Sequence, residues 1–255
     1  GLHPDNPRRG MPGIQGFVIL FDYASGAPVA LVEGATVTAV RTAAASALAT
    51  RNLAREKASS CGIFGTGTQA APHIEAMCAV RPIDKILLWG RDHAKARALA
   101  AEQAQLRGLT ILASEDPAEV GACDLVCTVT GSPTPILMGD WVQAGAHVNL
   151  VGSHTLTTRE ADTALLAKSD VYVDLLESAR NESGDLMIPL RTGEMSEENI
   201  RGEIGLVLSG ELAGRGSEAQ ITVYKSLGVV AQDLFAAHHV YQRALELGVG
   251  VSVDF

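Results

Sequence analysis

Residues 65–70 read Gly65-Thr66-Gly67-Thr68-Gln69-Ala70 and follow the short apolar run from Cys61 to Phe64. The pattern is G-x-G-x-x-A, which is typical of a dinucleotide-binding loop where it joins a strand to a helix. In that role the first glycine makes a tight turn, the second lets the backbone approach a pyrophosphate, and the alanine allows close packing of helix on sheet. The N–H groups at the start of the helix then face the phosphates. We therefore predict a dinucleotide site at Gly65, Gly67, Thr68 and Gln69, with a purely structural glycine turn as the alternative.

The chain on the carboxyl side of this loop alternates between strands and helices. Helical patterns cover residues 68–80 and 92–106, and apolar, strand-like runs cover residues 61–64, 85–89, 109–112, 124–129, 146–151 and 171–173. Alternation of this kind favours a parallel sheet with helices on both faces. We predict an α/β fold in which residues 56–214 form a Rossmann-type, doubly wound domain. Residues 178–185 are polar and are expected to form a loop, and residues 199–208 are expected to contain a short amphipathic helix.

Both ends of the chain have a different pattern. Residues 17–21 and 27–32 predict a β-hairpin, and the alanine-rich residues 38–56 predict a long helix with small side chains. Residues 220–224 favour a strand, and residues 229–247 a helix that ends at Gly248. We expect residues 1–55 and 215–255 to form one α+β dimerisation and substrate domain into which the Rossmann domain is inserted. The apolar faces of the hairpin and the long helix predict a homodimer.

Composition excludes several classes of protein. The chain of 255 residues has 20 Lys and Arg against 29 Asp and Glu, a net charge of −9, and no basic run, which argues against a nucleic-acid partner. It has no apolar run of the ~18 residues that a membrane span requires. The four cysteines form no C-x-x-C pair, so we expect free buried thiols, no metal site and a reducing compartment, the cytoplasm. No signal peptide is expected from the first residues.

The end of the second predicted strand bears on the choice of cofactor. Sites for NAD usually carry an acidic residue there that holds the ribose hydroxyls. This chain reads Trp89-Gly90-Arg91-Asp92, with glycine at the expected position of the acid and arginine next to it. A guanidinium suits a 2′-phosphate by charge and by bidentate geometry. We therefore favour NADP (NADPH) over NAD, with Asp92 as the alternative ribose ligand if the register differs by two residues.

Two further segments end at the carboxyl edge of the predicted sheet, where ligands bind in open α/β folds. They contribute Thr128, Val129 and Thr130 after one strand, and Val151, Ser153 and His154 after the next. We expect Ser153 and His154 to face the nicotinamide and the substrate, although a simple loop histidine is the alternative for His154.

Three segments together resemble the ornithine cyclodeaminase/μ-crystallin family. They are the glycine loop, the run Arg41-Thr-Ala-Ala-Ala-Ser46-Ala-Leu-Ala49, and Tyr224-Lys-Ser-Leu-Gly228 with Asp233. The resemblance covers nearly the whole chain in the right order. It implies NAD(P)-dependent enzymes of amino acids and cyclic imines, built from a Rossmann domain and a dimerisation domain made from both chain ends. It also implies that Leu227 belongs to the cofactor site.

The resemblance assigns roles to individual residues. Arg41 matches the arginine that binds the substrate carboxylate, and a helix-surface arginine paired with an acid is the structural alternative. The catalytic lysine of the family precedes a segment like residues 1–6, so we expect it to fall just before Gly1, with residues missing there. True ornithine cyclodeaminases have an aspartate as proton acceptor where this chain has His154.

An imidazole binds a distal ammonium poorly, yet it can donate a proton near neutral pH. We therefore expect an NAD(P)H-dependent reductase of a cyclic imine carboxylate such as Δ1-pyrroline-2-carboxylate, or a related amino-acid dehydrogenase. Arg41 would hold the carboxylate, and His154 or the missing lysine would deliver the proton. Ornithine cyclodeaminase, an NAD-dependent ammonia-lyase that forms proline from ornithine, is one alternative. A catalytically silent NADPH-binding protein is another.

Overall fold

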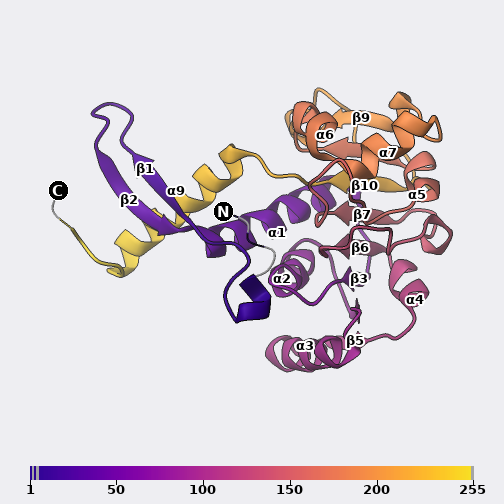
Figure 1. Ribbon diagram of the computed structural model, residues 1–255, viewed down its shortest axis with the longest axis horizontal. Helices are drawn as coiled ribbons and strands as arrows, with labels where there is room; N and C mark the ends of the chain where they lie inside the picture. The colour runs from indigo at the N-terminus through magenta and orange to yellow at the C-terminus, as the bar shows by residue number, and fades with distance from the viewer. Residues whose placement is uncertain (2, 4–5, 254–255) are drawn as a thin grey trace. The chain divides into compact units, whose positions relative to one another are not determined.

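The computed structural model describes Gly1, His3 and residues 6–253, and it divides into two compact units (Figure 1). The smaller unit comprises Gly1–Thr42 and Val229–Phe255, and the larger unit comprises Ala43–Gly228. Three residues of the segment used above to place the family's lysine, namely Leu2, Pro4 and Asp5, lie outside the described residues.

The larger unit contains, within the described residues, a sheet of eight strands that are all paired in parallel. The strands are β3 (Ser60–Phe64), β4 (Lys85–Trp89), β5 (Thr110–Ala113), β6 (Leu125–Thr128), β7 (His147–Leu150), β8 (Asp170–Val173), β9 (Ile200–Glu203) and β10 (Thr222–Lys225). Their spatial order is β5-β4-β3-β6-β7-β10-β8-β9. The chain builds outward from β3 to β5 and then returns to the other side of β3, so the topological switch point lies between β3 and β6. Open α/β sheets bind their ligands at that point.

Helices cover both faces of this sheet, as Figure 1 shows. One face carries α2 (Ala70–Val80), α3 (His93–Arg107) and the second half of α1 (Gly34–Leu53), and the other carries α4 (Pro117–Gly121), α5 (Thr163–Ala167) and α7 (Gly184–Thr192). Successive residues of a strand point to opposite faces. In β4, accordingly, Ile86 and Leu88 join the core beneath α2, whereas Leu87 joins the core beneath α4. The predicted doubly wound α/β fold is confirmed.

Two segments differ from the sequence-based expectations, and a third holds a strand besides the expected helix. Residues 178–185 are not a loop, because they belong to α6 (Leu176–Glu182) and to the start of α7, whose first turn is capped by the Ser183 hydroxyl at 3.3 Å from Leu186 N. Residues 199–208 contain a short helix as expected, α8 (Ile204–Ser209), but the first half of this segment is strand β9. Finally, β10 lies between β7 and β8 in the large sheet, so residues 215–228 belong to the larger unit and not with the C-terminal helix.

The smaller unit consists of an antiparallel hairpin, the start of α1 and the C-terminal helix. The hairpin pairs β1 (Phe17–Phe21) with β2 (Pro28–Glu33), as predicted, and α9 (Val230–Leu247) packs on both strands. Leu20, Val37 and Ala237 form its buried core. Several large apolar side chains of this unit are exposed: Phe17, Phe21, Leu31, Val230 and Phe235. None of the helices in the described part of the chain combines the length and the hydropathy that a membrane crossing needs.

Candidate functional site

The glycine loop leaves β3 in a conformation that requires glycine. Gly65 has φ +124°, and a Cβ built on it would lie 2.8 Å from the carbonyl oxygen of Val129. A side chain at Gly67, by contrast, would meet no atom within 4 Å, so this backbone faces open space. Ala70 then begins α2 as a fully buried residue. This tight turn, open backbone and small helix residue match what a bound pyrophosphate needs.

A cleft of about 470 Å3 lies at the switch point of the sheet. Its walls come from the ends of β3, β4 and β6 and from the first turn of α3, and they consist of Gly65, Thr66, Gly67, Trp89, Gly90, Arg91, Asp92, Lys95, Val129, Thr130, Gly131, Ser132 and Ile136. Strand ends, a glycine loop and a helix start are the parts from which dinucleotide sites are built. The residues present therefore fit such a cofactor.

Cationic side chains occupy the end of the cleft beyond β4. Arg91 lines the cleft there, and so does Lys95, which follows it by four residues in the first turn of α3. The carboxylate of Asp92 caps α3 by accepting a hydrogen bond from Lys95 N at 3.1 Å. Lys95 was not among the predicted site residues, although its spacing of four residues from Arg91 at a helix start could have indicated it.

Six residues predicted for the cofactor site lie outside these walls. They are Thr68, Gln69, Thr128, Val151, Ser153 and Leu227. The Thr128 hydroxyl instead donates to Glu160 at 2.8 Å, and the Ser153 hydroxyl donates to the carbonyl oxygen of Thr158 at 2.7 Å. The backbone N–H of Leu227 donates to Asp174 at 2.7 Å. The hydroxyl groups of Thr128 and Ser153 and the N–H of Leu227 therefore form hydrogen bonds within the protein.

His154 lies on the loop that follows β7, and its side chain is exposed. Its Nδ1 is 3.2 Å from the carbonyl oxygen of Gly152. The four cysteines are free, and all but Cys78 are buried. Within the described residues no group of three or more His, Cys, Asp or Glu side chains is arranged to hold a metal ion.

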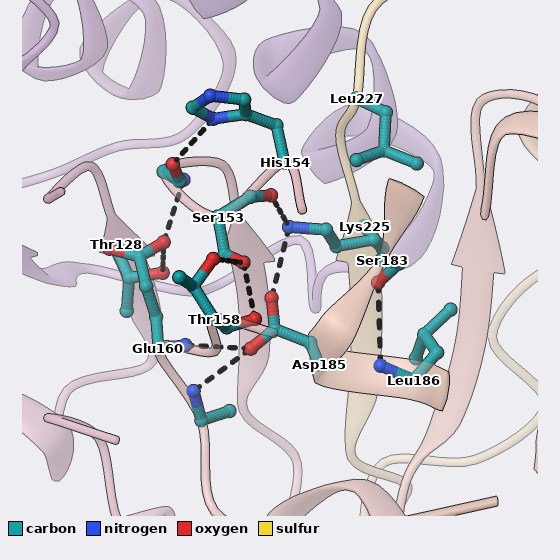
Figure 2. A network of polar contacts seen from close by, with 12 residues as sticks. Thr128, Ser153, His154, Thr158, Glu160, Ser183, Asp185, Leu186, Lys225 and Leu227 are labelled. Atoms are coloured by element: carbon teal, nitrogen blue, oxygen red, sulfur yellow. Dashed lines mark hydrogen bonds and ion pairs between the residues drawn. The ribbon is translucent and has the colours of Figure 1, made fainter. Parts of the chain in front are cut away.

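A buried charged network lies beneath this loop, and sequence reasoning did not find it. Figure 2 shows Lys225 of β10 reaching both Asp185 and the backbone of Ser153, with Glu160 between the ends of β6 and β7. The Lys225 Nζ lies 3.0 Å from the Asp185 carboxylate, and both side chains are completely inaccessible. The network comes from segments 25 and 40 residues apart, so no local motif indicates it.

Arg41 lies on α1 in the smaller unit and is only partly exposed. Its Nε donates to the Asp233 carboxylate at 3.0 Å, and its Nη1 donates to the side-chain oxygen of Gln232 at 3.0 Å. The structure thus gives Arg41 the acidic partner that was the structural alternative to a substrate-binding role.

Known proteins resemble this chain over almost its full length. The model of the "Ornithine cyclodeaminase/mu-crystallin family" matches residues 1–248. A Δ1-pyrroline-2-carboxylate reductase of Bacillus cereus is 39% identical over 254 residues, which are 99% of this chain and 78% of that protein. Among solved structures, Thermococcus litoralis Δ1-pyrroline-2-carboxylate reductase in complex with NADH and L-proline has a TM-score of 0.95 and 37% identity, covering 99% of this chain and 78% of that one. An archaeal alanine dehydrogenase dimer with bound NAD has a TM-score of 0.93 and 31% identity, covering 100% and 78%.

Proposed function

Because this chain belongs to the ornithine cyclodeaminase/mu-crystallin family, we propose that it is an NAD(P)H-dependent reductase of a cyclic imine carboxylate of the Δ1-pyrroline-2-carboxylate type. The observation that carries the proposal is the glycine-walled cleft at the switch point of the sheet, in a chain 39% identical to a Δ1-pyrroline-2-carboxylate reductase. A related amino-acid dehydrogenase uses the same chemistry in the opposite direction.

The chain's own residues bind the substrate and move a proton. When bound, the reduced nicotinamide supplies the hydride that saturates the carbon of the C=N bond. Arg41 binds the substrate carboxylate, because a guanidinium offers paired donors to a planar anion. His154 delivers a proton to the imine nitrogen, since imidazole is a side chain that serves as a general acid or base near neutral pH. Arg91 and Lys95 favour the binding of NADPH, because their positive charges attract its 2′-phosphate.

His154 favours reduction over ornithine cyclodeamination. The resemblance places an aspartate at this position in true ornithine cyclodeaminases, where it accepts a proton and handles the distal amine. An imidazole cannot offer a distal ammonium the charge of a carboxylate. A chain that binds the cofactor without catalysis is the candidate from another class.

An absorbance assay separates these three functions. Δ1-Pyrroline-2-carboxylate is offered with NADPH and, in parallel, with NADH, and the reduced cofactor is followed. The reductase consumes one cofactor for each imine, whereas the cyclodeaminase converts ornithine with no net change in cofactor. Cofactor binding without conversion of either substrate would identify a silent binding protein and refute the reductase.

Two attributes of the whole protein belong to the same proposal. The exposed apolar residues of the hairpin and α9 support a homodimer formed through the smaller unit. The free cysteines are compatible with the reducing cytoplasm.

A further inference from the structure

Three of the buried ionisable side chains of the larger unit form one network that has no part in the proposed chemistry. Glu160, Asp185 and Lys225 have exposed fractions of 0%, 1% and 0%. Burying a charged group is costly in free energy unless hydrogen bonds and opposite charges compensate it. The contacts of these three side chains therefore show which parts of the backbone they hold.

Glu160 ties the end of β6 to the end of β7. Its Oε1 accepts from Thr130 N at 2.8 Å and from Thr130 Oγ1 at 2.6 Å. Its Oε2 accepts from Thr128 Oγ1 at 2.8 Å and from Gly152 N at 2.6 Å. Four donors fill the four acceptor sites of an ionised carboxylate. Burial raises the pKa of Glu160, whereas the hydrogen bonds from Thr130 oppose that rise.

Asp185 and Lys225 extend the network to the loop that carries His154 (Figure 2). Asp185 Oδ1 accepts from Glu160 N at 2.8 Å and from Ala161 N at 3.1 Å. Its Oδ2 lies 3.0 Å from Lys225 Nζ, which also donates to the carbonyl oxygen of Ser153 at 2.5 Å. That carbonyl belongs to the peptide group joining Ser153 to His154.

The two loops that the network joins are in close contact. A Cβ on Gly152 would lie 1.9 Å from the carbonyl oxygen of Thr130, so the backbones approach as only glycine permits. Thr130 lines the cofactor cleft, and Gly152 lies two residues before His154. One buried network therefore contacts both a wall of the cleft and the loop proposed to deliver the proton.

We propose that Glu160, Asp185 and Lys225 are positioning residues that hold the Thr130 wall of the cleft and the His154 loop in the conformation that binds the cofactor. The part concerning His154 rests on the proposed function, and the part concerning the cleft does not depend on the substrate.

Glu160→Gln is the most direct test, because it keeps size and shape. The new amide NH2 must replace either Oε1 or Oε2, and so it must face either the N–H of Thr130 or the N–H of Gly152. Hydroxyl groups can rotate to accept from it, but a backbone N–H cannot. At least one of the two loops therefore loses its anchor.

Asp124→Asn is the matched control. Asp124 immediately precedes β6, at the opposite end of the strand from Thr130. Its Oδ2 accepts from the backbone N–H groups of Ser59 and Ser60 at 3.0 and 3.2 Å, and its Oδ1 pairs with Arg55 at 2.5 Å. The substitution thus disturbs a partly buried carboxylate that also anchors backbone N–H groups, at the end of β6 away from the cleft.

Two measurements decide the proposal. The first is amide hydrogen exchange without ligand, and the second is titration of NADH and NADPH by quenching of Trp89, which lines the cleft. In Glu160→Gln we expect faster exchange confined to residues 129–134 and 151–158, and roughly tenfold weaker binding of both cofactors. In Asp124→Asn, which loses the ion pair with Arg55, we expect any faster exchange to be confined to the neighbourhood of residues 55–60, with unchanged binding of both cofactors.

Unchanged exchange in both segments, or unchanged cofactor binding, in Glu160→Gln would overturn the proposal, and so would equal weakening in the control. If Glu160→Gln does not fold, Thr128→Val removes a single donor to Glu160 and should weaken binding in the same direction. A wild-type chain that reduces no imine would refute the proposed reaction while leaving the exchange result intact, so the two failures are distinguishable.

Discussion

The Nε of Arg41 donates to the Oδ1 of Asp233 at 3.0 Å, so a carboxylate fixes one edge of the guanidinium. Gln232 accepts from Nη1, and among the described residues Nη2 makes no hydrogen bond. Arg41 is thus held by neighbours on α9 and still has donors to offer to an anion. An acidic partner and a substrate-binding role are compatible, because a guanidinium has five N–H donors.

Replacing Arg41 by Met should raise KM for the imine carboxylate and lower kcat/KM by about 2–4 kcal/mol, since a charge-assisted contact to the substrate is lost. Steady-state kinetics measure this effect, and Trp89 quenching should show unchanged affinity for the cofactor. An Arg41→Met enzyme with the kcat/KM of the wild type would exclude Arg41 from substrate binding.

Asp233→Asn is the control for this experiment, because the amide oxygen still accepts from Arg41. The expected loss in kcat/KM is smaller than for Arg41→Met. If the only role of Arg41 were its ion pair with Asp233, both variants would lower the free energy of unfolding and leave KM for the imine carboxylate unaltered.

Two buried histidines predict that stability falls in mild acid. Burial lowers the pKa of His73 to about 4 and that of His147 to about 3. In the unfolded chain both histidines have a pKa of about 6.5. Below that pH the unfolded state therefore binds more protons than the folded state, which lowers the free energy of unfolding. The stability that neutral His73 contributes is fully present above about pH 6.5 and is lost as the pH falls towards 4. This loss is on the order of 3 kcal/mol. The contribution of His147 is lost over a wider range, down to about pH 3.

Urea unfolding over a series of pH values measures this loss. His147→Asn should remove up to one proton from the pH dependence between about 6.5 and 3. The Nδ1 of His147 lies 2.9 Å from the Thr222 hydroxyl, a contact that an asparagine can partly replace. Identical pH slopes for the wild type and the variant would contradict the assignment.

The sequence predicted the parts of the fold whose pattern is local. The apolar runs of β3 and β4 form interior strands of the sheet, with strands on both sides and helices on both faces, so their composition alone indicates strands. Strand β9 (Ile200-Arg-Gly-Glu203) lies at the sheet edge and is largely polar, so its composition does not indicate a strand, and the sequence did not predict it. The buried network of Glu160, Asp185 and Lys225 depends on the insertion of β10 between β7 and β8, and no local pattern encodes that order.

The exposed apolar surface of the smaller unit predicts a dimer at micromolar concentration. Phe235 on α9 is 75% exposed, and Phe17 on the hairpin is 65% exposed. Sedimentation of the wild type should give twice the chain mass, and Phe235→Asp should shift the mass towards the monomer. Leu106→Asp is the matched control, because Leu106 is 69% exposed on α3 of the larger unit and should not matter. Monomer mass for the wild type would refute the dimer.

The cations at the end of the cleft predict a preference for NADPH over NADH. Arg91→Ala should weaken the binding of NADPH by about 1.5 kcal/mol, which raises its Kd roughly tenfold. The binding of NADH should change much less, because only NADPH carries the 2′-phosphate. Lys95→Ala should act in the same direction, with a smaller effect because its ammonium already lies 3.7 Å from the Asp92 carboxylate. Fluorescence titration with both cofactors measures the preference. Equal weakening of the two, or an initial preference for NADH, would refute the assignment.

Introducing a carboxylate at Gly90 should reverse that preference. An aspartate there would accept hydrogen bonds from the ribose hydroxyls and would repel a 2′-phosphate. The Cβ would lie 2.8 Å from the Cγ2 of Thr66, however, so Gly90→Asp alone would force the Thr66 side chain to move. Thr66→Ser removes that methyl group, and the double variant therefore tests charge rather than crowding, with Thr66→Ser alone as its control. We expect the double variant to bind NADH more tightly than NADPH, whereas the control keeps the preference of the wild type. If the double variant still prefers NADPH, a side chain at position 90 does not contact the adenosine ribose.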